Sequence, residues 1–379
     1  GAQYMINKGN YITADCYADH FSSSYCFFKD NKTYNGKAGE EQVRKRTRNH
    51  NLSIKGIFKL GNRHKLSVGT EYIVDVLKSQ TDNIAKEDAY TLALFAQDEI
   101  KLLRNLQALI GVRYIYHENF KNHATPNVAL MYKPGKFNFR ASYAAGFRTP
   151  TLSELYATDI AKKNDRLTIG NLDLKPEKNN YFSLSAEYVH ERFSVSVNAF
   201  YNNIRDMIDY NTIATGDKAM EQYGHKEVRQ RDNIAEAKVH GINVSANAYL
   251  GAGFNLSGGY THLNTQDVEL EQPIDKSIKN AYNINAQWAH SWKIYRLNIN
   301  LNGRINSKRF SKSYGYAPEY QLWDLNTRHS FNLKSVIIEP GCGMENLFDY
   351  MDDRPYNSNY ATLTPGRSFY ISLSLKFKS

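Results

Sequence analysis

Apolar and polar residues alternate along most of this chain. The segment FYISLSLKFK, residues 369–378, carries apolar side chains at every second position: Phe369, Ile371, Leu373, Leu375 and Phe377. A period of two is the pattern of a β-strand with one apolar and one polar face. The same pattern recurs at residues 65–74, 182–188, 193–201 and 297–305. The sequence therefore predicts an all-β fold.

The connections between these segments alternate between short and long. Short turns are expected at residues 7–10, 61–64, 103–105, 133–136, 190–192, 251–253, 290–293 and 331–334. Long connections are expected at 30–45, 79–88, 117–124, 147–178, 211–226, 264–277, 306–319 and 349–365. This arrangement is typical of a transmembrane antiparallel up-and-down β-barrel, here with about 17 strands, the first only a stub.

Other architectures explain the pattern less well. A propeller requires a repeat of about 40 residues, a sandwich seldom has this many long hairpins, and no stretch approaches the roughly 20 apolar residues of a membrane helix. In a membrane barrel the apolar face meets lipid and the polar face lines the lumen. We expect residues 1–379 to form part of one such domain.

Charge and cysteine content point to no further class. The net charge is +10, but the one dense basic run, RKRTR at 44–48, is interpreted as a solvated loop end rather than a phosphate-binding patch, and no nucleic-acid partner is expected. Cys16, Cys26 and Cys342 have no zinc-site spacing. A Cys16–Cys26 bridge is possible in principle, but single buried or lipid-facing thiols are favoured. No catalytic motif is present, so neither an enzyme nor a cofactor is expected.

Several segments, taken in order, resemble one known family. They are LALFAQDEIKL (92–102), LIGVRYIYH (109–117), GFRTPTLSELYA (146–157), GNLDLKPEKN (170–179), ENLFDY (345–350) and GRSFYISLSLKF (366–377). This series resembles the C-terminal part of a TonB-dependent outer-membrane receptor. Such receptors have about 22 strands and a plugged lumen. The resemblance, together with the absence of a signal peptide in GAQYMINKGN, implies a piece of a longer chain without its plug domain and first strands.

The resemblance also implies a function. It predicts an active importer in the outer membrane of a Gram-negative bacterium, carrying a metal chelate such as a ferric siderophore, haem or cobalamin. The implied partners are outer-membrane lipid, the inner-membrane TonB energy complex and a surface lipoprotein. The alternative is a passive pore or an adhesion barrel without an energised step. The segment between the two central motifs, 151–170, contains no histidine, which weakens the haem interpretation.

Those two central motifs are expected to form the feet of the longest external loop. Thr151 is predicted to cap one helical turn, with Glu154 three residues on, and Pro176 to hold the chain extended where it re-enters the sheet. The loop is either purely architectural or part of a ligand mouth. Its charges, Lys162, Lys163 and Arg166 against Asp159 and Asp165, favour an anionic ligand.

Five residues are candidate ligand contacts. Arg148 either holds a ligand carboxylate through two parallel hydrogen bonds or braces the loop against a carboxylate of the barrel. Tyr156 is the one residue of the loop suited to ferric iron, and His225 is the histidine available for haem. Tyr314 and Tyr316 belong to an aromatic loop that suits a flat ligand or, alternatively, an interfacial aromatic girdle. No metal site intrinsic to the protein is expected.

Overall fold

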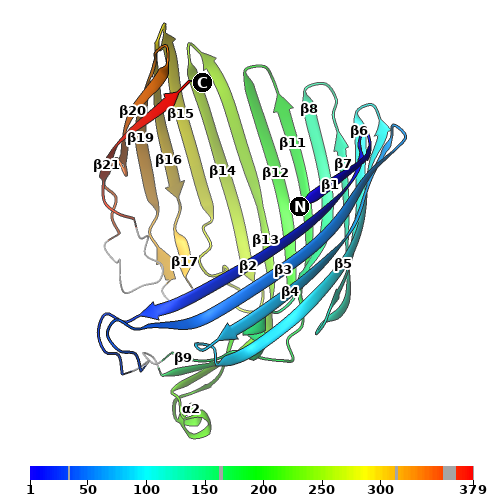
Figure 1. Cartoon of the computed structure of the whole chain (residues 1–379), viewed down its shortest axis with the longest axis vertical. Helices are drawn as coiled ribbons and strands as arrows, with labels where there is room; N and C mark the ends of the chain where they lie inside the picture. The colour runs from blue at the N-terminus through cyan, green and yellow to red at the C-terminus, as the bar shows by residue number, and fades with distance from the viewer. Residues whose placement is uncertain (33–34, 162–164, 312–314, 353–363, 379) are drawn as a thin grey trace. The chain divides into compact units, whose positions relative to one another are not determined.

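The computed structural model describes residues 1–32, 35–161, 165–311, 315–352 and 364–378. Within these residues the chain forms 21 strands and two short helices (Figure 1). Four strands are pieces of three or four residues inside connections, namely β9 (Thr158–Ala161), β10 (Arg166–Ile169), β17 (Arg309–Ser311) and β18 (Gly315–Ala317). The remaining seventeen described strands, beginning with the stub β1 (Ala2–Asn7), confirm the predicted number.

The chain divides into two compact units, which are described separately. The first comprises Gly1–Leu130, Ser142–Tyr181 and Asn203–Glu236. Its β1 is followed by an antiparallel meander in which each strand pairs with the next (Figure 1). The members of this meander are β2 (Asn10–Cys26), β3 (Glu41–Leu60), β4 (His64–Ser79), β5 (Ile84–Leu103) and β6 (Leu106–His117).

The second unit comprises Met131–Ala141, Phe182–Asn202 and Ala237–Ser379. It is also an antiparallel meander. Its strands are β14 (Phe254–Asp267), β15 (Asn280–Trp292), β16 (Tyr295–Asn306), β19 (Tyr320–Asn332), β20 (Val336–Glu345) and β21 (Ser368–Phe377). Five strands contribute residues to both units: β7 (Lys121–Tyr132), β8 (Phe137–Arg148), β11 (Glu177–Val189), β12 (Phe193–Thr215) and β13 (Glu227–Gly251).

The helices are minor elements. Helix α1 (Leu152–Tyr156) and helix α2 (Gly216–Tyr223) both lie in connections of the first unit. Neither helix in the described part of the chain is long and apolar enough to cross a membrane.

The strands carry the two faces that the alternation predicts. On β3 the exposed positions include Leu52 and Ile54, which are 49% and 44% exposed. Leu52 pairs with Tyr72 of β4, which in turn pairs with Leu92 of β5, and directly opposed residues share a face of the sheet. The opposite face is polar and contains ion pairs such as Lys65–Glu99. An apolar face left exposed, rather than packed on a second sheet, is what a lipid-facing surface requires.

Three predicted long connections are shorter than expected. Only residues 80–83 separate β4 from β5, only 118–120 separate β6 from β7, and β12 continues to residue 215 before α2. These segments are polar in sequence, but their backbones pair with a neighbouring strand and so continue the ladder beyond the apolar stretch. Strands β3 and β5 each have 20 residues, whereas a membrane crossing needs about 9–11.

One further expectation is corrected. The basic run at 44–48 is not a loop end, because all of it lies within β3 (Glu41–Leu60). The thiols of Cys16, Cys26 and Cys342 are free, as favoured, and all three residues are exposed, which excludes the buried alternative and leaves the lipid-facing one. No Cys16–Cys26 bridge forms.

Candidate functional site at the base of the longest loop

A capped helical turn begins the loop that follows β8. The Thr151 hydroxyl accepts a hydrogen bond from the backbone N–H of Glu154 at 3.2 Å, and the Glu154 carboxylate accepts one from the backbone N–H of Thr151 at 2.8 Å. This reciprocal pair is a capping box, which satisfies two N–H groups that a helix start otherwise leaves free. The predicted cap and its partner are confirmed.

Arg148, the last residue of β8, joins three elements through its guanidinium. It donates to the two carboxylate oxygens of Glu177 at 2.8 and 2.6 Å and to those of Glu154 at 2.9 and 3.2 Å. Glu177 begins β11 and also accepts the backbone N–H of Ile208, on β12, at 2.8 Å. Four of the five N–H donors that a guanidinium offers are therefore used by protein carboxylates. These are the contacts of the brace proposed for Arg148, and they surround one positive charge with two negative charges.

Backbone contacts fasten the returning half of the loop. The N–H of Asn171 donates to the carbonyl of Glu154 at 3.0 Å. Asn233 of β13 accepts the N–H of Lys175 at 2.7 Å and donates to the carbonyls of Lys175 and Asp206 at 2.9 and 2.6 Å. Because a buried or crowded backbone group must find a partner, these side-chain bonds fix where the chain enters β11.

Gly170 lies where the two halves of the loop touch. A Cβ added there would stand 2.5 Å from the carbonyl oxygen of Leu155 and 2.9 Å from the backbone nitrogen of Tyr156. We expect Gly170→Ala to displace α1 from its position against residue 170 and to destabilise the loop by about 1–3 kcal/mol, as overpacking does. Faster limited proteolysis within residues 151–175 is the measurement. Gly258→Ala is the control, since the nearest atom to its added Cβ is 3.4 Å away; equal cleavage of the two variants contradicts the prediction.

A small apolar seat supports α1. Leu155, Leu174 and Ile208 are buried together, and Tyr156 and Phe120 pack against them. Burial raises the pKa of the Tyr156 phenol above its ordinary value, and the carboxylates of Glu87 and Glu118 add to the shift. The phenolate, which is the form that binds ferric iron, is therefore harder to form here than on a free tyrosine.

A cavity of about 160 Å³ opens beside this seat, within the first unit. Charged and polar residues from several elements line it, among them Asp82, Asp159, Arg166, Tyr210, Arg229 and Arg231. Arg231 donates to the Tyr210 hydroxyl at 2.7 Å and stacks over its ring. The buried Nε of Arg166 has no acceptor among the described residues. An unused charged donor in a small cavity is suited to an anionic group.

Asp159 lies in the same cavity with a perturbed acidity. Burial, and then the nearby charge of Asp82, raise the pKa of the Asp159 carboxyl above its ordinary value. Part of its negative charge is therefore lost at a higher pH than for a free aspartate.

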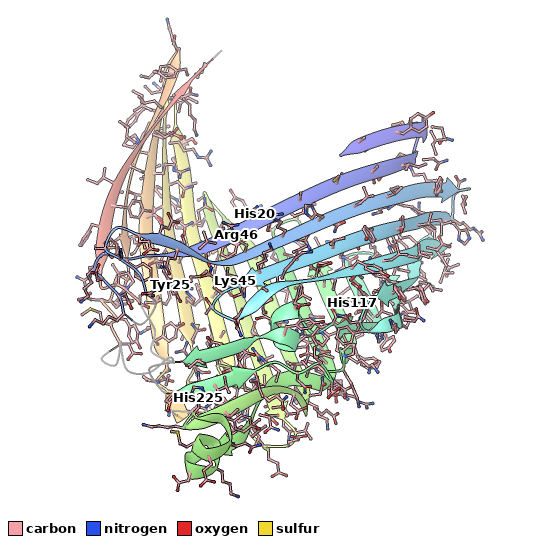
Figure 2. All side chains as sticks on the ribbon, turned by 60° about the horizontal axis from the view of Figure 1, so that its bottom comes forward. His20, Tyr25, Lys45, Arg46, His117 and His225 are labelled. Atoms are coloured by element: carbon pink, nitrogen blue, oxygen red, sulfur yellow. The ribbon has the colours of Figure 1, made fainter. Side chains whose placement is uncertain are left out.

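His225 and Tyr316 are not among the residues that line the cavity. His225, labelled in Figure 2, contacts Asp165 with 2.9 Å between Nδ1 and Oδ1, next to the parallel pairing of β10 with β13. That hydrogen bond lowers the pKa of the Asp165 carboxyl. Tyr316, in β18 of the second unit, is 57% exposed and has its ring 5.3 Å from that of Phe310. Tyr314, Lys162 and Lys163 lie outside the described residues.

The acidity of Glu154 makes the loop base sensitive to pH. Burial raises the pKa of this carboxyl, but the hydrogen bonds from Arg148 and Thr151 outweigh burial and lower it overall. A depressed folded-state pKa stabilises the fold above the unfolded value of about 4.3, and this stability is lost as pH falls through the folded value. We expect the protection factors of residues 151–157, which correct exchange rates for the intrinsic effect of pH, to be high at pH 7 and to fall below about pH 4.3. Glu154→Gln is expected to show lower protection at pH 7 that no longer depends on pH in this range; a protection profile like that of the unchanged protein contradicts the assignment.

Sequence reasoning missed the partners that hold the loop. Glu177 and Asn233 were not singled out, nor was Asp82, whose carboxylate accepts the Ser153 hydroxyl at 3.2 Å. The only local signal was the glutamate directly after Pro176. Among the described residues there is no group of three or more metal-ligating side chains.

The sequence and the fold of this chain both match known proteins. Residues 3–347 match the family model described as TonB dependent receptor-like, beta-barrel. The structure resembles the ferric enterobactin receptor of Pseudomonas aeruginosa (TM-score 0.79, 18% identity), covering 98% of this chain and 60% of that one. It also resembles the siderophore receptor PirA of Acinetobacter baumannii (TM-score 0.72, 16% identity, 98% and 63% covered) and the FrpB iron transporter of Neisseria meningitidis (0.70, 14%, 96% and 61%).

These matches establish the fold and the family. At such identities the solved structures show a shared fold, and the chain spans about three fifths of their length. The predicted class, an antiparallel up-and-down sheet of the receptor-barrel type, is confirmed. The relatives are receptors and a transporter rather than enzymes. This chain belongs to the TonB-dependent receptor β-barrel family.

Proposed function

We propose that this chain is the barrel part of an outer-membrane receptor that imports an iron chelate and is energised through the TonB complex. The observation that carries the proposal is the family match over residues 3–347. The similar structures add support, since they include a ferric enterobactin receptor in complex with enterobactin and an iron transporter. Outer-membrane lipid and a surface lipoprotein are the further proposed partners. Residues 1–379 would act as one part of a single barrel.

The ligand we propose is anionic, such as a ferric siderophore. The reason is the cavity beside α1, where the Arg166 Nε is buried without an acceptor among the described residues and Arg231 adds positive charge, while Arg229 is paired with Glu227. In this proposal Arg166 contacts the ligand, and Arg148 positions the loop through Glu154 and Glu177. Tyr156, His225, Tyr314 and Tyr316 stay proposed residues of the mouth. Haem and cobalamin are the competing ligands.

The experiment uses the full-length receptor in cells that lack their own copy. The cells are supplied with a ferric siderophore, haem or cobalamin in separate experiments. The compound whose metal is taken up identifies the ligand class. Collapse of the proton-motive force is expected to stop uptake while surface binding persists, because the energy complex acts after binding. Uptake that survives the collapse supports a passive pore and contradicts the energised step.

Arg166→Ala tests the proposed contact in the same receptor. We expect its affinity for the anionic chelate to fall by about 1.5–3 kcal/mol, the range for a hydrogen bond to a charged group. Arg104→Ala is the matched control, because Arg104 is an exposed residue of the short turn between β5 and β6. Equilibrium binding to purified receptor measures both. Equal affinities for the two variants remove Arg166 from the proposed site.

A further inference from the structure

A basic patch lies on the exposed apolar face of the first unit. Arg46 of β3 pairs with Lys78 of β4, and Arg48 pairs with His20 of β2. All four residues are exposed, and Figure 2 labels His20 and Arg46 on these neighbouring strands. Because exposure alternates strictly along residues 45–54 of β3, Arg46 and Arg48 share their face with the exposed Leu52. We call Arg46, Arg48, Lys78 and His20 the outward basic patch.

No residue in the described part of the chain neutralises the charges of this patch. Among the described residues, Arg46, Arg48 and Lys78 make no ion pair and no side-chain hydrogen bond. Their neighbours on the other face differ: Lys45 pairs with Asp82 at 3.4 Å, and Asn49 donates to Asp75 at 2.8 Å. The run at 44–48 thus separates into a neutralised face and a free cationic face.

The patch stands where the apolar surface ends. Along β4 the same face carries Val74 and Val76, and Lys78 is the next position on it. The rings of Tyr72 and Tyr90 lie 6.0 Å apart on the apolar part of this face, and the ring of Tyr116 lies 6.1 Å from that of Tyr90. Tyrosine rows are characteristic of the boundary between hydrocarbon and headgroups. Lys78 lies beyond this row, six positions after Tyr72 and four after Val74, the residue paired with Tyr90.

A hollow beside the patch offers space for a ligand group next to the basic side chains. It has a volume of about 390 Å³, and the residues around it include Arg44, Arg46 and Lys78. No carboxylate is found among the described residues that line it. Arg44 already has partners, the ring of Tyr25 and the side chains of Gln42 and Gln80, so it is held in place at the edge. Arginine is well suited to phosphate, because its planar fork of N–H donors matches two phosphate oxygens.

We propose that the outward basic patch binds the phosphate groups of a phosphorylated lipid of the outer leaflet. This inference rests on the proposed outer-membrane location of the receptor. A lipid is favoured over a soluble anion because the basic patch adjoins an exposed apolar surface. The phosphate groups of one lipid molecule would bind the patch, and its acyl chains would cover the apolar surface. Two unpaired arginines near an anionic membrane surface add to binding in proportion to their charge.

The test measures binding of bisphosphorylated lipid A to the full-length receptor in detergent, by native mass spectrometry. The double variant Arg46→Ser with Arg48→Ser is expected to bind about thirtyfold more weakly. Lys55→Ser, a change of an exposed lysine on the polar face of the same strand, is expected to bind as the unchanged receptor does. The double variant Arg46→Lys with Arg48→Lys keeps the charge but loses the planar fork, so it is expected to bind more tightly than the serine variant and more weakly than the unchanged receptor. Dephosphorylated lipid A is expected to bind weakly to all variants.

Several outcomes overturn the proposal. They are equal lipid binding by the serine double variant, equal binding of the dephosphorylated lipid, and inorganic phosphate that binds as tightly as the lipid. Chelate uptake by the same variants is measured in parallel and is expected to be unchanged. If the receptor without substitutions takes up no chelate, the proposed transport function is wrong. If this receptor binds phosphorylated and dephosphorylated lipid A equally, only the proposed lipid site is wrong.

Discussion

Glu177→Ala is expected to loosen the base of the longest loop by about 2–3 kcal/mol. The Glu177 side chain is only 15% exposed, and it accepts hydrogen bonds from Arg148 and from the backbone N–H of Ile208. Removing it leaves that N–H without its acceptor, which costs about 1–3 kcal/mol. The loss of the ion pair adds less, because Arg148 is 43% exposed and keeps Glu154, and solvent screens such a pair.

Hydrogen exchange of the full-length receptor measures this effect. Residues 148–157 and 206–210 are expected to lose protection in Glu177→Ala, and Glu177→Gln is expected to lose less because an amide oxygen can still accept from Ile208. Glu191→Ala, in the exposed short turn before β12, is the control. Unaltered exchange in Glu177→Ala shows that the contacts of Arg148 do not hold the loop.

Arg148→Ala separates the two interpretations of this arginine. As a brace, it should lose protection in the same segments as Glu177→Ala, with chelate affinity per folded molecule unchanged. As a ligand residue, it should lose affinity by about 1.5–3 kcal/mol while the loop keeps its protection. The four hydrogen bonds to Glu154 and Glu177 favour the first result.

The predictable features of this chain depend on neighbours in sequence. The capping box joins Thr151 to Glu154, three residues apart, so a local pattern reveals it. The strands follow from a period of two, which is also local. The features that sequence reasoning missed join distant residues: Arg148 to Glu177 across 29 positions and Asn233 to Lys175 across 58. Such pairs depend on the register between strands, which no local pattern specifies.

The strand extensions were missed for a related reason. Residues 79–88 and 211–215 are polar, and polar segments between apolar ones are usually loops. A strand that continues beyond the membrane needs no apolar residues, however, because water solvates both of its faces there. The backbone hydrogen bonds to the neighbouring strands are enough to hold it in the sheet. The same reasoning predicts a loop end at the basic run 44–48, but its location within β3 places its alternate residues on opposite faces of the strand.

Ile54→Arg is expected to have the largest effect on folding in this part of the chain. Ile54 lies on the apolar face of β3 between Ala14 of β2 and Thr70 of β4, and is 44% exposed. An arginine on a lipid-facing position near the bilayer midplane costs about 2–4 kcal/mol. The full-length receptor carrying this change should insert poorly, and equilibrium unfolding from lipid vesicles should show the loss.

Ser53→Arg adds the same side chain to the adjacent position and is expected to be tolerated. Ser53 lies on the other face of β3, where its cross-strand partners are Asp15 and Glu71, the latter already paired with Arg113, so the new charge meets the Asp15 carboxylate and water instead of lipid. Opposite charges on directly opposed residues are mildly stabilising, by about 0.2–1 kcal/mol. The difference between the two variants thus reports which face meets the membrane. Equal stabilities contradict the assignment of the faces, and a larger loss for Ser53→Arg reverses it.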